Sequence, residues 1–504
     1  MAVALVNLPL FVILAGIGML AMYVPALHAL SVSSHAEARA FFYSGTLGLL
    51  ILTMVVVALA GRPPVRSTMH NLVVLLAAFT VLPLLLAVPF YEALRTTSFL
   101  NAYFEMVSSL TTTGAVLFDP ERLSPTLHLW RALVGWLGGL LMWVSAAAIL
   151  APLSLGGFEV TATGQPVQYD RNWRQTERAD PQHRVVRAAL GLAPVYAALT
   201  VVLWMSLVIA GDGALTAFSH ATAVMATSGI TPLASTQVPG SGLWGEALMA
   251  LFLLFALSRV TFSRDTRATA SPGVYADREF RLGLVLVLTI PLVMFVRHWA
   301  GAIEINSSED SATALRALWG GVFTVLSFLT TTGLESTEWA AARDWSGLNT
   351  TGLIFMGLAM IGGGVATTAG GIKLLRVWAL YLNVLREMER LVHPSSVGRA
   401  RANDRRMRRQ GAYIAWLFLM LFALTLTVIV LLLTAFGQSF EHATVLATAG
   451  LSTTGPLIGF APEVPIVLAD IGPGAKLTLC AAMVLGRLEM LAIISLITSN
   501  LWRE

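Results

Sequence analysis

Ten long apolar segments constrain the fold of this chain more than any other feature. They lie near residues 8–28, 38–60, 70–92, 128–153, 186–210, 241–260, 281–299, 346–390, 411–436 and 473–499. A helix needs roughly 20 residues to cross the hydrocarbon core of a bilayer, and each segment is long enough. Only 12% of the residues are charged, against about 25% in a soluble domain. We therefore expect an all-α polytopic membrane protein.

Basic residues indicate the orientation of these segments. The connections 61–70, 161–187, 259–281 and 373–409 hold 22 of the 32 Lys and Arg residues, and they alternate with acidic connections such as 300–345. Connections rich in Lys and Arg face the cytoplasm. We therefore expect both termini to be cytoplasmic, because the number of crossings is even. The basic excess thus reflects topology and does not indicate nucleic-acid binding.

Four shorter apolar pieces lie between the long segments, at 98–110, 213–225, 311–329 and 438–451. Such pieces suit re-entrant half-helices better than complete spans. Polar residues that favour helix N-caps precede them: Thr97 or Ser98, Asp212, Ser307 or Ser308, and Ser439. The sequence therefore predicts four repeats of span, half-helix, turn and span.

Each half-helix leads into a turn of small hydroxyl residues that ends in glycine. The four glycine turns comprise Thr111, Thr112, Thr113 and Gly114; Thr227, Ser228 and Gly229; Thr331, Thr332 and Gly333; and Thr453, Thr454 and Gly455. A single such turn is more often a close helix contact, but four in register are not explained in that way. Non-helical backbone at membrane depth is tolerated where it is buried in protein or lines a water-filled path. We therefore expect the turns to surround one axis, where stacked backbone carbonyls replace the hydration shell of a monovalent cation.

Further motifs resemble a known family. They are "WRALVGWLGG" (130–139), "MIGGGVATTAGGIKLLRV" (360–377) and "MVLGRLEM" (483–490). With the glycine turns, they make nearly the whole chain similar to the Trk/Ktr/HKT cation transporter superfamily, most closely to its TrkH-type branch. The resemblance implies four repeats around one pore, two leading helices and a homodimer in the cytoplasmic (inner) membrane. It also implies a cytosolic ring of nucleotide-binding subunits that respond to NAD(H) and to ATP or ADP.

The resemblance implies potassium as the substrate, because all four turns carry glycine. The ions would be held mainly by backbone carbonyls at Thr112, Thr113, Thr227, Ser228, Thr331, Thr332, Thr453 and Thr454. Pro456 follows Gly455 as in the family, although an alignment of 220–229 with 442–450 would instead nominate Gly450. No cofactor is expected in this chain itself.

The expected organisation follows from the repeats. Two extra N-terminal helices occupy 1–60, and the repeats occupy 68–160, 183–267, 278–395 and 408–504.

Residues 346–390 cannot form one straight helix, because about 45 residues would span roughly 67 Å, twice the hydrocarbon core. The break is expected at "GGGVATTAGG" (362–371), the glycine-rich loop. Its candidate gate residues are Gly362, Gly363, Gly364, Thr367, Thr368, Gly370 and Gly371, with Lys373 at its end. The resemblance implies that this loop obstructs the pore and moves aside on activation.

Arg487 is a charge deep in the last apolar segment, where such residues usually face a cavity or a partner. We expect it to project toward the pore beneath the glycine turns and to raise the barrier for cations. Glu489, only two residues away, is not expected to pair with it. Glu105 and Glu441 are candidate cation attractors at the outer side, although capping or solvation explains them equally well.

Other transport and enzyme functions would share some of these features but not all of them. The same repeats of half-helix and glycine turn would fit the pore subunit of an ATP-driven potassium pump or a sodium-permeable transporter. A membrane-embedded enzyme would need convergent acid, base or metal residues, but the sequence contains no HExxH and no GxSxG. We therefore expect no enzyme. The residues fit passive, proton-coupled and sodium-coupled uptake alike.

Overall fold

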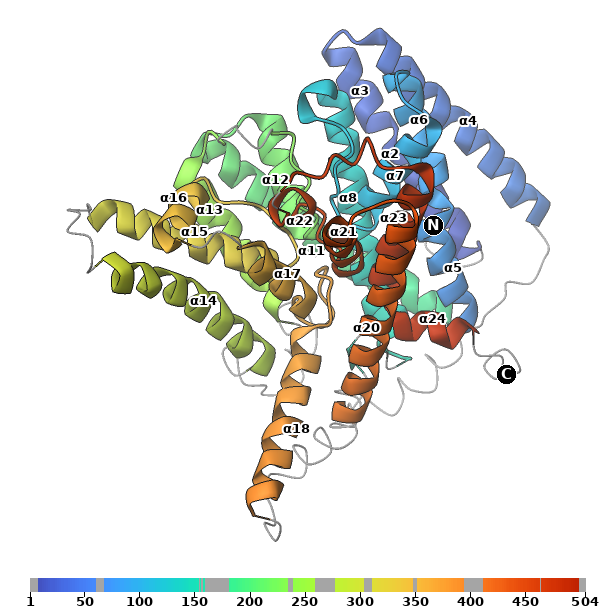
Figure 1. Cartoon of the computed structure of the whole chain (residues 1–504). Coiled ribbons are helices and arrows are strands. Elements are labelled where there is room, and N and C mark those ends of the chain that lie inside the picture. Colours follow the sequence, from blue (N-terminus) through green and yellow to red (C-terminus); the bar gives the residue numbers. More distant parts are fainter. Residues whose placement is uncertain are drawn as a thin grey trace.

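The computed structural model describes most of the chain. The described ranges are 8–59, 68–153, 155, 157–158, 181–233, 239–258, 277–302, 311–347, 351–393, 411–462 and 464–497. Within them every regular element is a helix (Figure 1), which confirms the predicted all-α class. Seven helical stretches there are long and apolar enough to cross a membrane: Leu10–Ser31, His35–Leu59, His70–Leu94, Pro125–Leu150, Gln182–Ala210, Arg278–Val296 and Ala412–Ala435.

Three leading helices precede the first repeat. They are α2 (Leu10–Ala21), α3 (Tyr23–Ser31) and α4 (His35–Leu59). The first two form one apolar stretch that is interrupted only at Met22, so the leading region contains two spans. Helix α4 packs against α2, α3 and the first repeat. Many of its apolar side chains are exposed, as expected for a helix that faces lipid.

The first and second repeats have the predicted order of helices. Repeat one contains α5 (Thr68–Thr80), α6 (Leu82–Leu94), the short helix α7 (Phe99–Leu110), η1 (Pro120–Arg122) and α8 (Pro125–Ser145), which continues as η2 (Ala146–Leu150). Repeat two contains α11 (Pro181–Ala210), the short helix α12 (Ala214–Ala226) and α13 (Gly242–Leu253), which continues as η3 (Leu254–Leu257).

The third and fourth repeats follow the same order with more interruptions. Repeat three contains α14 (Arg278–Ala302), α15 (Ser311–Leu329), α16 (Trp339–Ser346), α17 (Gly352–Ile361) and α18 (Leu374–Val392). Repeat four contains α20 (Ala412–Ala435), α21 (Phe440–Ser452), α22 (Leu457–Phe460), α23 (Pro473–Leu488) and α24 (Met490–Ile497).

Three of the ten expected segments do not form one continuous span in the structure. The segment near 241–260 forms an apolar helical stretch that is too short to count as a complete span. The segment 346–390 is broken between α17 and α18 at the glycine-rich loop, as predicted. The last segment was expected to run without a break to residue 499, but α23 ends at Leu488, where Glu489 takes a positive φ of 63°, and α24 follows from Met490.

The helix contacts close the four repeats into a ring. The pore helices α7, α12, α15 and α21 each pack against the helices before and after them in their own repeat. Each also packs against a helix of the preceding repeat: α12 against α8, α15 against α13, and α21 against α17. The circle closes because α7 packs against α23 of the last repeat. Figure 1 accordingly shows α21 near the centre of the molecule.

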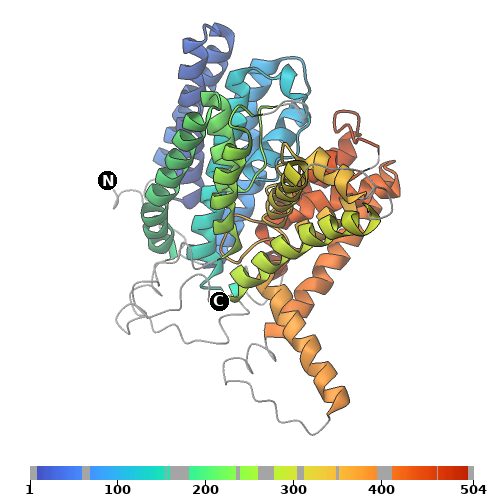
Figure 2. The ribbon, with the colours of Figure 1, turned by 90° about the vertical axis from the view of Figure 1, so that its left-hand side faces the viewer.

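Helix α18 extends beyond the rest of the bundle in both views (Figures 1 and 2). Its first turns are buried against α14 and α20. Further along, exposed side chains include Tyr381, Val384, Met388 and Leu391. The helix therefore links the centre of the molecule to a projecting surface that carries apolar side chains.

Candidate ion pathway

The four glycine turns share one backbone conformation at the residue two positions before the glycine. Thr112, Thr227, Thr331 and Thr453 have φ values of 53°, 49°, 59° and 55°. Such left-handed angles are uncommon for residues other than glycine and are costly for β-branched side chains. Strain of this kind persists only where the surrounding structure enforces it, and it concentrates at functional sites. Its recurrence at four equivalent positions marks the turns as one constructed site.

The first three turns approach one another through glycine. Gly114 and Gly229 have φ values of 71° and 63°. A Cβ atom on Gly114 would lie 1.8 Å from the carbonyl oxygen of Ser228, and one on Gly229 would lie 2.1 Å from the carbonyl oxygen of Thr332. Glycine is therefore required both for the backbone angle and for the approach of the next turn.

The fourth turn completes the circle in a different way. A Cβ atom on Gly333 would lie 3.0 Å from Pro456. The backbone N–H of Gly455 donates a hydrogen bond to the carbonyl of Thr113, with an N···O distance of 2.6 Å. The turns thus contact one another in the order one, two, three, four and one, and they enclose a single axis.

The structure also places the two glycines considered for the fourth turn. Gly450 lies inside α21 and faces Leu479 and Ala482 of α23. Gly455 lies at the ring, two residues after the left-handed Thr453. The ring of turns is therefore formed with Gly455.

Hydroxyl groups brace three of the four turns from within. The paired side-chain oxygens are those of Thr111 and Thr113 at 2.9 Å, Thr330 and Thr332 at 3.2 Å, and Ser452 and Thr454 at 3.2 Å. In the second turn Ala226 occupies the first of these positions, so this brace cannot form there. Each pore helix ends immediately before its turn, so the partly negative helix C-termini point toward the ring.

A buried ion pair supports the first turn. Nε of Arg131 lies 2.5 Å from Oε1 of Glu105, and both side chains are only 1% exposed. The second carboxylate oxygen of Glu105 accepts a hydrogen bond from the backbone N–H of Leu117, just beyond the turn. The suggestion that Glu105 attracts cations from solvent is therefore wrong, because its carboxylate is enclosed. Hydropathy and spacing gave no signal for Arg131.

A second buried carboxylate, Glu246 of α13, holds the chain after the third turn. It accepts hydrogen bonds from the Ser336 hydroxyl at 2.7 Å and from the backbone and hydroxyl of Thr337 at 2.6 and 2.7 Å. The indole N–H of Trp319 donates a further bond at 2.9 Å. Glu246 was not predicted from the sequence. An acidic residue in an apolar segment was the available signal.

The glycine-rich loop is closed at its base. The backbone N–H of Ile372 donates to the carbonyl of Met360 at 2.8 Å, and the backbone N–H of Lys373 donates to the carbonyl of Ile361 at 2.9 Å. Nζ of the buried Lys373 donates to the carbonyl of Ala369 within the loop. The remaining candidate gate residues therefore lie on a compact loop with fixed ends.

The loop is hydrogen-bonded directly to the glycine turns. The backbone N–H of Gly370 donates to the Thr331 hydroxyl at 2.7 Å, and the hydroxyls of Thr227 and Thr368 are 3.1 Å apart. A Cβ atom on Gly370 would lie 2.2 Å from Oγ1 of Thr453. Three of the four left-handed threonines therefore contact the loop, which covers one end of the ring.

Arg487 lies against the same loop. Its side chain is buried, and Nη1 donates a hydrogen bond to the carbonyl of Thr368 at 2.5 Å. The atoms Nε and Nη2 have no hydrogen-bond partner among the described residues. Arg487 therefore brings an incompletely compensated positive charge to the covered end of the ring.

Glu489 does not pair with Arg487, as expected from their spacing. Its carboxylate instead accepts a hydrogen bond from Nη2 of Arg376 at 2.6 Å, within a buried ion pair. The Arg376 guanidinium also lies 3.7 Å from the ring centre of Phe418 on α20. This cluster joins the start of the projecting α18 to the end of α23, which carries Arg487.

Together, the repeats, the ring of turns and the loop define a membrane protein with one central path suited to a cation. Known proteins with similar sequences and structures point to the same kind of molecule. Residues 281–502 match the family model of TrkH, described as a cation transport protein. The Trk system potassium uptake protein TrkI of Halomonas elongata is 29% identical over 96% of this chain and 94% of its own length. TrkH of Escherichia coli K12 is 27% identical over 96% of both chains.

A solved structure agrees over the whole fold. The crystal structure of the potassium transporter TrkH from Vibrio parahaemolyticus covers 98% of both chains with a TM-score of 0.78 and 25% identity. Over nearly its whole length, the chain is therefore similar to TrkH-type cation transport proteins.

Proposed function

We propose that the chain is the pore-forming subunit of a Trk-type potassium uptake system in the cytoplasmic membrane. The ring of four glycine turns is the observation that carries this proposal. Relatives across the length of the chain are named as Trk system potassium uptake proteins, which supports potassium as the substrate. The chain then acts as a transporter and not as an enzyme.

The ring selects the ion by replacing its hydration shell. Backbone carbonyls and threonine hydroxyls of the four turns provide successive rings of oxygen ligands for a dehydrated cation. The negative ends of four pore helices lower the electrostatic cost of the ion at the low-dielectric midplane. No acidic side chain is needed in the turns, and none is present in their sequence.

The glycine-rich loop and Arg487 form the gate. The loop obstructs the path through its hydrogen bonds to Thr227 and Thr331, and the Arg487 charge repels a cation leaving the ring. Opening requires these bonds to break and the loop to move away from the axis. The hydrogen bonds at the base of the loop keep its ends fixed while its tip moves.

The orientation and partners follow from charge and from the surface of α18. The basic connections support a cytoplasmic location for both termini and for the projecting end of α18. The projecting α18 then offers apolar and basic side chains to a cytosolic ring of nucleotide-binding subunits of the TrkA type. Binding of NAD, ATP or ADP to that partner would change the position of the loop through a movement of α18. The transporter itself forms a homodimer.

Uptake of rubidium and potassium by potassium-uptake-deficient cells tests the function. The cells express the full chain, alone or with the regulatory subunit, and sodium is added as competitor. We expect growth at low potassium and rubidium uptake that excess sodium does not inhibit. Equal competition by sodium and potassium would contradict a potassium-selective pathway.

A further inference from the structure

Three of the pore helices carry a polar residue at one equivalent position. Glu105, His220 and Thr324 each lie nine residues before the glycine of their turn. Each contacts the chain just beyond that glycine: Glu105 binds the backbone N–H of Leu117, and Thr324 accepts a weak bond from the backbone N–H of Ser336 at 3.4 Å. In the fourth repeat Leu446 takes this position. The position therefore serves to tether the exit of the turn to its pore helix.

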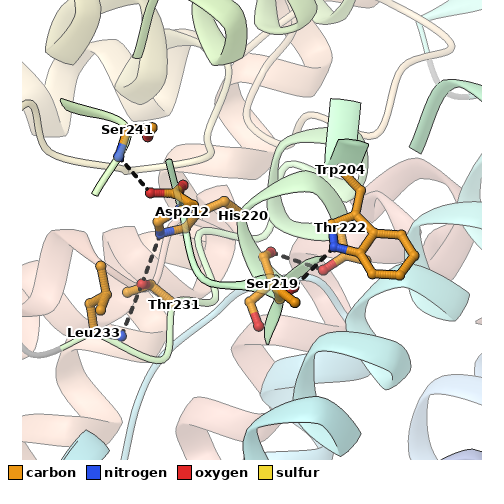
Figure 3. Close-up of polar contacts among 9 residues, drawn as sticks. Trp204, Asp212, Ser219, His220, Thr222, Thr231, Leu233 and Ser241 are labelled. Carbon is orange, nitrogen blue, oxygen red and sulfur yellow. Dashed lines mark hydrogen bonds and ion pairs between the residues drawn. The ribbon is translucent and has the colours of Figure 1, made fainter. Parts of the chain in front are cut away.

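In the second repeat this tether runs through a histidine (Figure 3). Nε2 of His220 lies 3.2 Å from Oγ1 of Thr231, which is two residues beyond Gly229. The same hydroxyl oxygen accepts a hydrogen bond from the backbone N–H of Leu233 at 3.2 Å. The imidazole is buried, with 4% of its side chain exposed. His220 thus connects α12 to the segment that leaves the second glycine turn.

The other side of the His220 imidazole faces Asp212. Nδ1 of His220 lies 3.6 Å from Oδ2 of Asp212. Oδ1 of Asp212 accepts a hydrogen bond from the backbone N–H of Ser241, at the start of α13, at 2.8 Å. Asp212 was expected to cap α12, but the N-cap is Gly213 and the carboxylate is directed to these groups instead. Asp212 therefore orients the imidazole, and Nε2 is left to contact Thr231.

The second turn depends on this tether more than the others do. It lacks the hydroxyl brace, because Ala226 stands where the other turns have Thr or Ser. Its Ser228 carbonyl also packs directly against Gly114 of the first turn. A shift of the second turn would therefore move a carbonyl that lies at the contact between the first and second turns.

We propose that His220 is a positioning residue for ion selectivity, which holds the second glycine turn in place through Thr231 while Asp212 orients its ring. The inference rests on the proposed function, because selectivity is defined only for a cation pathway. Carbonyl placement sets the difference between the free energies of a dehydrated potassium and a dehydrated sodium ion in the ring. A turn that is free to relax would discriminate less between them.

Two amide substitutions distinguish the contact of His220 with Thr231 from its contact with Asp212. In His220→Gln the side-chain amide reaches the position of Nε2 and can keep the contact with Thr231. In His220→Asn the amide reaches only the position of Nδ1, so it can keep the contact with Asp212 and loses Thr231. Thr231→Val removes the hydroxyl at nearly constant volume. His442→Asn, on the fourth pore helix, is the matched control.

In potassium-uptake-deficient cells we would determine the sodium concentration and the potassium concentration that each halve rubidium uptake. The measured quantity is the ratio of the first concentration to the second, and this ratio does not depend on the expression level. We expect His220→Asn to lower this ratio about five- to tenfold, the effect of one lost hydrogen bond. Thr231→Val also removes the acceptor of the Leu233 backbone N–H, and it should lower the ratio at least as much. His220→Gln and His442→Asn should stay near the wild-type value.

The outcomes distinguish the two claims. A wild-type protein that does not prefer potassium would refute the proposed function itself. A selective wild type with unchanged ratios in His220→Asn and Thr231→Val would overturn only the role of His220. Loss of selectivity in His220→Gln but not in His220→Asn would also overturn it, because Asp212 alone would then matter. If His220→Asn does not reach the membrane, Thr231→Val decides the question alone.

Discussion

Nη1 of Arg487 donates a hydrogen bond to the backbone carbonyl of Thr368 at 2.5 Å, and so joins the end of α23 to the tip of the glycine-rich loop. The two residues are 119 positions apart in the sequence. The bond has two effects, because it holds the loop across the ring and places a positive charge beside the path. The closed gate is thus one unit of loop and guanidinium.

Removing that guanidinium should open the gate. A hydrogen bond to a charged group contributes about 1.5–3 kcal/mol. Its loss therefore shifts the equilibrium between the closed and open states toward the open state by roughly tenfold or more. We expect Arg487→Ala to raise basal rubidium flux in proteoliposomes by about that factor, since the electrostatic barrier falls as well. Arg39→Ala, at an exposed position on α4, is the control. Flux that stays at the wild-type level in Arg487→Ala would argue against this gate.

Two threonines of the ring, Thr331 and Thr112, provide a matched comparison. Oγ1 of Thr331 accepts the bond from Gly370, whereas Oγ1 of Thr112 is buried without a hydrogen-bond partner among the described residues. Thr331→Val leaves a buried N–H unpaired, at a cost of about 1–3 kcal/mol. We expect Thr331→Val to raise basal flux roughly tenfold, and clearly more than Thr112→Val, which removes an equivalent hydroxyl of the ring but breaks no bond to the loop. Equal effects of the two substitutions would show that the Gly370 bond does not hold the loop.

The pair of Arg376 and Glu489 should contribute strongly to stability. Removing one partner of a buried ion pair typically costs about 3–5 kcal/mol. Arg376→Leu and Glu489→Gln should each lower the unfolding temperature in detergent, and the double variant should lose less than the sum of the two. The exposed pair of Glu387 and Arg390 on α18 is the control, where alanine should cost under about 1 kcal/mol. Additive losses would indicate that the pair is not coupled.

Asp212 predicts a pH dependence of stability. Burial raises the pKa of its carboxyl, but the nearby His220 imidazole and the hydrogen bond from the backbone N–H of Ser241 outweigh that effect and bring the pKa below the ordinary value of 3.8. A depressed pKa stabilises the folded state above the unfolded pKa, and this contribution is lost as the pH falls through the folded pKa. The difference in unfolding temperature between wild type and Asp212→Asn should therefore be complete above pH 3.8 and should shrink below it. A difference that stays constant with pH would contradict this.

The short-range features of the site could be predicted from the sequence. Glycine, hydroxyl residues and helix caps act over a few residues, so the pore helices and the loop break were expected. Ser98 and Ser439 do cap α7 and α21. Ser307 and Ser308 lie outside the described residues.

Features that depend on tertiary contacts could not be predicted. The positive φ of Thr331 and of Glu489 is enforced by packing, because neither residue type favours it. The partnership of Glu105 with Arg131 requires α7 and α8 to be placed side by side first. Hydropathy likewise predicted a continuous last span, since it does not register a backbone break between apolar residues.

The central claim is that the four glycine turns form one selective ring, and Gly114 tests it most directly. Gly114→Ser adds a side chain where a Cβ atom would lie 1.8 Å from the Ser228 carbonyl. Gly357→Ser on α17 is the matched control, because its Cβ would meet no atom within 4 Å. The measurement is rubidium uptake with sodium or potassium as competitor. We predict that wild type and Gly357→Ser prefer potassium and that Gly114→Ser loses this preference. An unchanged preference in Gly114→Ser would contradict the assignment of the turns as the selectivity filter.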